Sequence, residues 1–141
     1  MAWTLICAIA LWQNGKSVRF LESPTATNEL LDAIPFDQRL ADLRRLVENV
    51  DLMQERFRRF IAAYRTANAE ELAALQGLAE SESPVVMVAL IYGRSKRWLP
   101  EILRMHASSD RAAICVGAFH CFGEHGLPTL IANEGIDVTY E

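Results

Sequence analysis

The 141-residue sequence predicts an α/β fold that is rich in helix and holds a small, mostly parallel sheet. Residues 112–116 form a continuous apolar run that stops at Gly117, which is typical of a strand buried on both faces. Residues 17–22 alternate polar and apolar side chains and then become apolar, as a strand entering a sheet does. Helical patterns separate these two segments, and parallel strands need such long crossovers. We expect one domain over residues 1–141.

The chain opens on an apolar segment, residues 2–12, which we predict to be a buried helix. Asn14 and Gly15 follow it, and either can supply the left-handed residue that ends a helix. The segment is too short to cross a bilayer and lacks the basic start and the cleavage site of a signal peptide. We therefore expect no membrane span and take the cytoplasm as the default location. A short helix is predicted next, at residues 27–34, and Pro35 ends it.

Apolar residues recur between Phe36 and Tyr64 at alternating steps of four and three, a heptad pattern of about four repeats. As one helix this segment would be roughly 45 Å long, longer than a small domain is wide. Two interpretations stay open. The favoured one is a pair of helices broken near residues 49–51 and packed on their own domain; the other is a coiled coil that joins two copies through residues 36–64. The arginines here are interpreted as a solvated face.

Helical patterns continue toward the second predicted strand and follow it. We expect Asn68 to cap a helix over residues 69–80, and Pro84 to open another that runs to Met105. Pro100 should kink this helix or mark a second start. The last elements expected are a short helix at residues 127–133 stopped by Gly135 and a terminal strand at residues 136–140.

Charge and cysteine usage exclude some classes of function. The formal net charge is −4, and acidic residues are interspersed among the arginines, so we expect no nucleic-acid partner. The three cysteines are an odd number without close paired spacing, which favours free thiols in a reducing compartment.

Three charged or polar residues stand where chemistry is expected. His120 follows the predicted strand and Gly117, whose backbone can turn sharply or approach a ligand closely, and Glu22 ends the other predicted strand. Together the imidazole and the carboxylate would make a metal pair or an acid/base pair. Arg94 follows a buried helical stretch and either snorkels or reaches into this site. The structural alternatives stay open: a hydrogen-bonded loop histidine, a helix-capping carboxylate and a surface arginine.

Cys121 and His125 lie close to His120 in the sequence and could extend it to a small metal cluster. No Cys-x-x-Cys pair or second histidine pair supports this extension, so the signal is weak.

Three segments resemble a known family. Residues 117–127, GAFHCFGEHGL, resemble the C-terminal Gly-x-x-His signature of the TraB/GumN family. Residues 94–100 are similar to its Arg-Asn-x-x-Trp-Leu-Pro segment, with Ser95 in place of the asparagine. Residues 15–23 are similar to its Gly-Lys-x-Val-x-x-Leu-Glu-Thr strand. These segments occur in the family's order and span most of the chain.

The resemblance implies an α/β fold shared with Tiki-type proteases and erythromycin-esterase-like proteins, and metal-dependent hydrolysis of peptides. It implies a divalent metal ion held by His120 and Glu22, with Arg94 as a further site residue and Gly117 beside the cofactor. Such an ion would polarise a carbonyl and activate a bound water.

The chain also departs from the family's pattern, which begins with another Gly-x-x-His that no residue here matches. We therefore expect a domain truncated at its N-terminus relative to the family. The alternative function is a non-catalytic binding or assembly module that uses residues 36–64.

Overall fold

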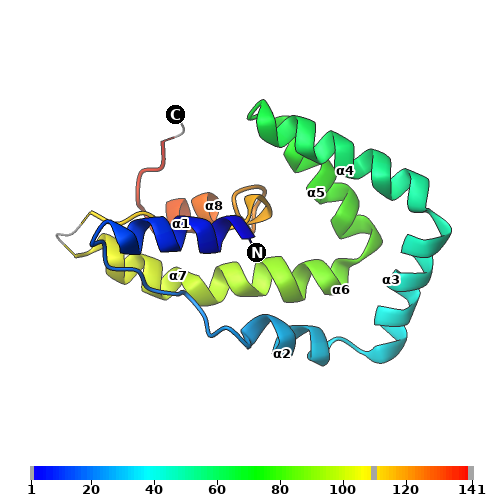
Figure 1. Cartoon of the computed structure of the whole chain (residues 1–141), viewed down its shortest axis with the longest axis horizontal. Coiled ribbons are helices and arrows are strands. Elements are labelled where there is room, and N and C mark those ends of the chain that lie inside the picture. Colours follow the sequence, from blue (N-terminus) through cyan, green and yellow to red (C-terminus); the bar gives the residue numbers. More distant parts are fainter. Residues whose placement is uncertain (1, 109–110, 140–141) are drawn as a thin grey trace.

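The structure is a computed structural model that describes residues 2–108 and 111–139. The chain is 69% helical, and no β-strand occurs within these ranges (Figure 1). The predicted α/β fold with a parallel sheet is therefore wrong. In chain order the elements are α1 (Ala2–Gln13), α2 (Ala26–Ala33), α3 (Phe36–Glu48), α4 (Val50–Arg65), α5 (Ala69–Glu82), α6 (Pro84–Met87), the π-helical segment η1 (Val88–Tyr92), α7 (Gly93–His106), the 3₁₀ turn η2 (Ala118–His120) and α8 (Leu127–Asn133).

The segments predicted as strands have no regular secondary structure in the described ranges, and residues 21–22 form a bend. Residues 111–115 are exposed, so this apolar run is not the doubly covered strand that its sequence predicts. Leu21 and Val116, at the ends of two of these segments, contact the core. An apolar run indicates a tendency to be buried, whereas a strand also needs a neighbour in register. Tyr140, at the end of the predicted terminal strand, lies outside the described residues.

The core lies between α7 and α8, which pack against each other. Its buried members are Trp98 and Ile102, one turn apart on α7, and Leu127 at the start of α8. Side chains from the flanking segments cover them further: Leu21, Met105, Val116 and Ile131. This core positions the helix that carries Arg94.

A long helical stretch runs through α6, η1 and α7 and continues through Pro100, which marks no second start. Pro84 opens it, as predicted. At its middle the turn widens, and the backbone N–H of Gly93 donates to the carbonyl of Val88, five residues back. A Cβ at Gly93 would lie 3.0 Å from this carbonyl oxygen, so glycine permits the close approach. Isolated π turns are frequent at functional sites, and this one directly precedes Arg94.

Helices α3 and α4 are separate, with a break at Asn49, so the favoured two-helix interpretation of the heptad segment is confirmed at this point. The Asn49 side chain donates to the carbonyl of Arg45 at 2.8 Å and so caps the end of α3. Helix α4 packs against α5. Figure 1 shows α2, α3 and α4 following an arc that returns through α5 to α6.

Many apolar side chains of this arc are exposed. We call them the outer apolar face: Phe36, Leu43, Leu46, Val47, Val50, Leu52, Phe57, Ile61 and Tyr64, all exposed. The inward positions include polar residues, Asp42, Arg45 and Arg56 among them. Leu40, Met53 and Phe60 are half-buried, and the rings of Phe60 and Phe119 have centroids 5.4 Å apart, so only part of the stripe packs on its own domain.

Several local predictions are confirmed, with one correction. Helix α1 forms, and Gly15 follows it with a φ of 69°. Trp12 is 74% exposed, however, so the predicted burial is wrong at this end of α1. The side chain of Asn68 accepts from the backbone N–H of Glu71 at 3.0 Å and caps α5, and Gly135 follows α8 with a φ of 82°.

Among the described residues no single helix is long and apolar enough to cross a membrane. Only the pair Ala69–Glu82 and Pro84–His106, bent by 119° at its break, meets the criteria of length and composition when both helices are taken together.

Candidate functional site

The three predicted site residues come from distant parts of the sequence and lie in one cluster. Arg94, in the first turn of α7, donates from Nε to Glu22 Oε2 at 3.1 Å and from Nη2 to Glu22 Oε1. Its remaining nitrogen, Nη1, donates to the carbonyl of Leu90 at 3.1 Å. The ion pair is mostly buried, with about a fifth of each side chain exposed. Arg94 therefore holds both carboxylate oxygens of Glu22 in a bidentate arrangement.

The indole of Trp98 connects this ion pair to His120. The guanidinium carbon of Arg94 lies 4.8 Å from the centroid of the indole ring, a cation–π contact. The rings of Trp98 and His120 have centroids 4.6 Å apart. Trp98 also belongs to the core, so the site is built directly on the best-packed part of the fold.

The hydrogen bond between His120 Nδ1 and Ser95 Oγ, 2.9 Å long, fixes the state of the imidazole. Ser95 is fully buried, and its hydroxyl donates its one hydrogen to the carbonyl of Ile91 at 3.1 Å. The hydroxyl oxygen must therefore accept from Nδ1–H. This places the proton of the neutral ring on Nδ1 and leaves the lone pair on Nε2, for which the described residues supply no partner.

Burial keeps His120 uncharged. It lowers the pKa of His120 to about 4, and the positive charge of Arg94 acts in the same direction, while Glu22 opposes it. A neutral imidazole with its proton on Nδ1 can accept a hydrogen bond or a proton, or bind a metal ion, through Nε2. The low pKa makes Nε2 a weak base near neutral pH.

Gly117 has a backbone conformation that does not itself require glycine. Its φ of −65° and ψ of 146° are open to any residue, and a Cβ there would lie 3.7 Å from the His120 ring, an ordinary contact. Its carbonyl accepts from the backbone N–H of His120 at 2.9 Å and closes η2. The tight turn at this position therefore forms without a positive φ, and a place for Gly117 beside a ligand stays a prediction.

Sequence reasoning did not assign roles to Ser95 and Trp98. Both follow Arg94 on α7, at the next position and four positions on, and both are buried. The sequence did offer one signal for them: Ser95, a small polar residue, lies three positions before the aromatic Trp98 and so on the same face of the helix. Such a pair places a hydroxyl and a ring side by side.

The described residues do not by themselves fit a resident metal ion. The predicted ligands are one imidazole and one carboxylate, and Arg94 already occupies both oxygens of that carboxylate. No group of three or more His, Cys, Asp or Glu among the described residues is arranged to hold a metal ion. Catalytic zinc usually has three protein ligands.

The weak prediction that Cys121 and His125 extend the site is likewise not supported among the described residues. The ring of His125 lies 4.5 Å from that of Tyr92, and burial raises the pKa of the Cys121 thiol.

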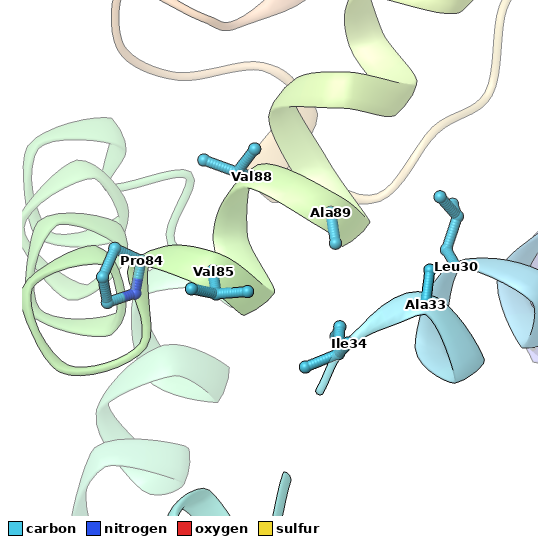
Figure 2. A pocket seen from close by; sticks show the side chains of 7 residues that line it. All are labelled: Leu30, Ala33, Ile34, Pro84, Val85, Val88 and Ala89. Atoms are coloured by element: carbon cyan, nitrogen blue, oxygen red, sulfur yellow. The ribbon is translucent and has the colours of Figure 1, made fainter. Parts of the chain in front are cut away.

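An apolar cavity of about 370 Å³ lies between α2 and the start of the long helical stretch, away from this site. Figure 2 shows its seven lining side chains, which include Leu30 and Ile34 from α2 and its end, and Val85 and Val88 from the opposite wall. None of them carries a titratable group. The cavity therefore offers no groups for the chemistry predicted at His120.

The model of the TraB/PrgY/gumN family matches residues 7–140. No curated protein and no solved structure matches the chain.

Proposed function

Because this chain belongs to the TraB/PrgY/gumN family, we propose that the cluster of Glu22, Arg94 and His120 is a hydrolytic site that acts on peptides. One observation carries the proposal: three residues far apart in the sequence converge, and the imidazole among them is buried, neutral and fixed in one tautomer. An active site needs fixed geometry of this kind, because a misplaced reacting group lowers the reaction rate.

Each residue has a distinct part in this proposal. His120 Nε2 accepts a hydrogen bond from the attacking water and then its proton. Arg94 holds Glu22 and stacks on Trp98, and Trp98 in turn packs on the imidazole. The ion pair thus positions the histidine through the indole. Ser95 keeps the proton on Nδ1, so Nε2 stays available.

The divalent metal ion implied by the resemblance is not used in this mechanism, because the described donors do not suffice for it. Addition of Zn²⁺, Mn²⁺ or Co²⁺ is therefore one variable of the test. A further ligand, from the substrate or from another chain, would be needed to complete such a site.

The experiment measures cleavage of a fluorogenic peptide library by the full chain. We expect hydrolysis by the wild type and a loss of at least about 100-fold in His120→Ala and in the more conservative His120→Gln, the scale of a lost proton acceptor. His106→Ala is the matched control, because His106 is exposed at the end of α7. Thermal melts establish that each variant is folded. No cleavage by the wild type with or without metal, or equal rates in the folded variants, would refute a hydrolytic site.

A second candidate function, assembly of two copies, is favoured by the outer apolar face. Large apolar side chains are exposed along both α3 and α4, Phe57 at 63% and Val47 at 61% among them. Both signs of charge are also exposed along these helices, as in Arg44 and Glu48, so an antiparallel copy can place unlike charges opposite each other.

The mass in solution tests this second function. We expect a concentration-dependent dimer whose dissociation constant rises at least about tenfold in Val47→Glu and Phe57→Glu, since each change buries a charge. Ile9→Glu is the control, because Ile9 is exposed on α1, outside the arc. A monomer at all concentrations would contradict assembly through this face.

A further inference from the structure

The apolar cavity between α2 and the start of the long helical stretch opens to the surface, and we call it the apolar groove. One wall comes from α2 and its end and the other from α6 and η1, and the volume is about 370 Å³ (Figure 2). In the second wall Val85 is 43% exposed and Val88 is 57% exposed. A cavity of roughly 150 Å³ takes a benzene ring, so this groove has room for two large apolar side chains.

The chain exposes more surface than a compact monomer of its mass. Its accessible surface is 10324 Å². A folded monomer of 15.8 kDa exposes roughly 7,300 Å². The surplus of roughly 3,000 Å² exceeds the ~800 Å² that each partner buries in an interface of standard size and is large enough for an obligate dimer. The area therefore favours a second copy of the chain as the occupant of exposed apolar surface.

Helix α4 carries side chains that match the apolar groove. Phe57, Ile61 and Tyr64 lie at positions i, i+4 and i+7 of α4, and they are 63%, 38% and 59% exposed. An amphipathic helix places its anchors in an apolar groove with this spacing. Phe57 and Ile61 are the two large side chains that the volume admits, which leaves Tyr64 at the rim, where its hydroxyl meets water.

The order of the elements along the arc brings α4 of a second copy to this groove. Ile34 lines the apolar groove, and Phe36, where the outer apolar face begins, follows two residues later. When two arcs pair in antiparallel orientation, with α3 against α3, α4 of each copy lies opposite α2 of the other (Figure 1). The two-fold relation then fills both grooves, as in an isologous interface.

The charges of α2 and α4 are complementary. Helix α2 carries Glu29 and Asp32 and no basic residue, whereas α4 carries four arginines and two acidic residues. The side chain of Asp32 is 81% exposed and lies only within 3.7 Å of its partner Arg39, and Arg65 at the end of α4 forms no ion pair among the described residues. Unlike charges therefore favour α4 beside α2 over α2 beside α2.

We propose that a second copy of this chain occupies the apolar groove, with Phe57 and Ile61 of its α4 inserted between α2 and η1. The proposal rests on the second candidate function, since it names the surface that receives the outer apolar face. Each copy both donates α4 and receives it, so the apolar walls of the groove and the apolar side chains of α4 are buried together.

Cross-linking between two copies tests where α4 lies. The full chain is prepared with p-benzoylphenylalanine in place of Phe57, mixed with isotope-labelled wild type and irradiated, and mass spectrometry identifies the cross-linked peptides. We expect cross-links from the probe to residues 30–34 or 84–89 of the other copy. The same probe in place of Phe20, which is 73% exposed and lies before α2, is the control and should not reach these residues.

Two variants close the apolar groove itself. Ala33→Trp fills it from within the same chain, and Val88→Lys places a charge where an apolar side chain of the other copy should lie. Each should raise the dissociation constant of the dimer at least about tenfold. Ala132→Trp and Ile9→Lys are the matched controls, because both residues are exposed and neither lines the groove. Thermal melts establish that each variant is folded.

The outcomes separate docking in the groove from assembly as such. A dimer that Val47→Glu weakens but that folded Ala33→Trp and Val88→Lys leave unchanged would overturn docking in the groove and keep the outer apolar face as an interface. Cross-links from the probe only to α3 or α4 of the other copy would overturn it as well. A monomer at all concentrations would refute assembly and this proposal together.

Discussion

The hydrogen bond from His120 Nδ1 to Ser95 Oγ decides what the imidazole can do. Because Ser95 donates to the carbonyl of Ile91, it can only accept from the ring. A single buried hydroxyl thus selects the tautomer, and the stacking on Trp98 selects the ring plane. Both constraints come from the helix that also carries Arg94.

The burial of His120 predicts a pH-dependent stability. The pKa of His120 is about 4 in the folded chain, below its ordinary value of 6.5, so between these pH values the unfolded chain binds more protons. Stability from this residue is complete above pH 6.5 and is lost as pH falls toward 4, by up to about 3 kcal/mol. Urea unfolding at pH 7, 6, 5 and 4 measures it.

His120→Gln should remove this part of the dependence of the unfolding free energy on pH. His106→Gln should leave that dependence unchanged, because His106 is exposed. Equal slopes in the wild type and His120→Gln would show that the imidazole is protonated as easily in the folded chain as in the unfolded one.

The positions of Glu22, Arg94 and His120 in one cluster could be anticipated from the resemblance. The ends of two parallel strands do not bring them together, because no strand occurs among the described residues. Ser95 was not predicted, because a small polar residue three positions before an aromatic one on a helix is a weak signal. The pairing of Glu22 with Arg94 was open as well, since an arginine at a helix start can equally stay at the surface.

At the scale of elements, local signals predicted helices well and strands poorly. Helix ends depend on nearby residues, such as Asn68 at α5, Pro84 at α6 and Gly135 after α8, so sequence alone specifies them. Strands depend on distant partners. Residues 112–116 have the composition of a buried strand, but no neighbouring strand exists within the described ranges, and the segment forms no regular secondary structure.

Two glycines of different elements should respond to alanine in opposite ways. At Gly126, before α8, a Cβ would lie 2.6 Å from the carbonyl oxygen of Phe122, so Gly126→Ala should destabilise the chain by about 1–3 kcal/mol. At Gly77, inside α5, nothing lies within 4 Å, and Gly77→Ala should stabilise it by about 0.5–1 kcal/mol. Chemical denaturation measures both, and a tolerated Gly126→Ala would contradict the packing of this loop.

At the scale of the whole molecule, side chains of α3 and α4 form ion pairs and hydrogen bonds with the residues where α5 ends and α6 begins. Arg56 donates to both carboxylate oxygens of Glu82, at 2.6 and 2.8 Å, and this pairing lowers the pKa of Glu82. Arg45 donates to the backbone carbonyl of Glu82 and to the hydroxyl of Ser83, 2.6 Å away in the latter case. Polar contacts thus hold part of the inner side of the arc, while many of its apolar side chains are exposed.

Loss of one of these ion pairs should destabilise α3 and α4 without destabilising the core. Arg56→Gln removes the bidentate pair and should lower hydrogen-exchange protection in α3 and α4 by about 1 kcal/mol, while α7 is unchanged. Arg58→Gln is the control, because its partner Glu55 lies on the same helix and the pair is exposed. Equal loss in α4 and α7 would mean that the arc and the core unfold together.

The widened turn at Val88–Tyr92 also sets how far α7 is rotated about the helix axis relative to α6. A π turn is in effect an α-helix with one inserted residue, and each residue of an α-helix turns the chain by roughly 100°. Deletion of a single codon in this stretch would leave α6 and α7 as a regular helix. Arg94, Ser95 and Trp98 would then be rotated away from Glu22 and His120 relative to the buried Met87. A one-residue length polymorphism, without any change at the site itself, is therefore enough to take the site apart.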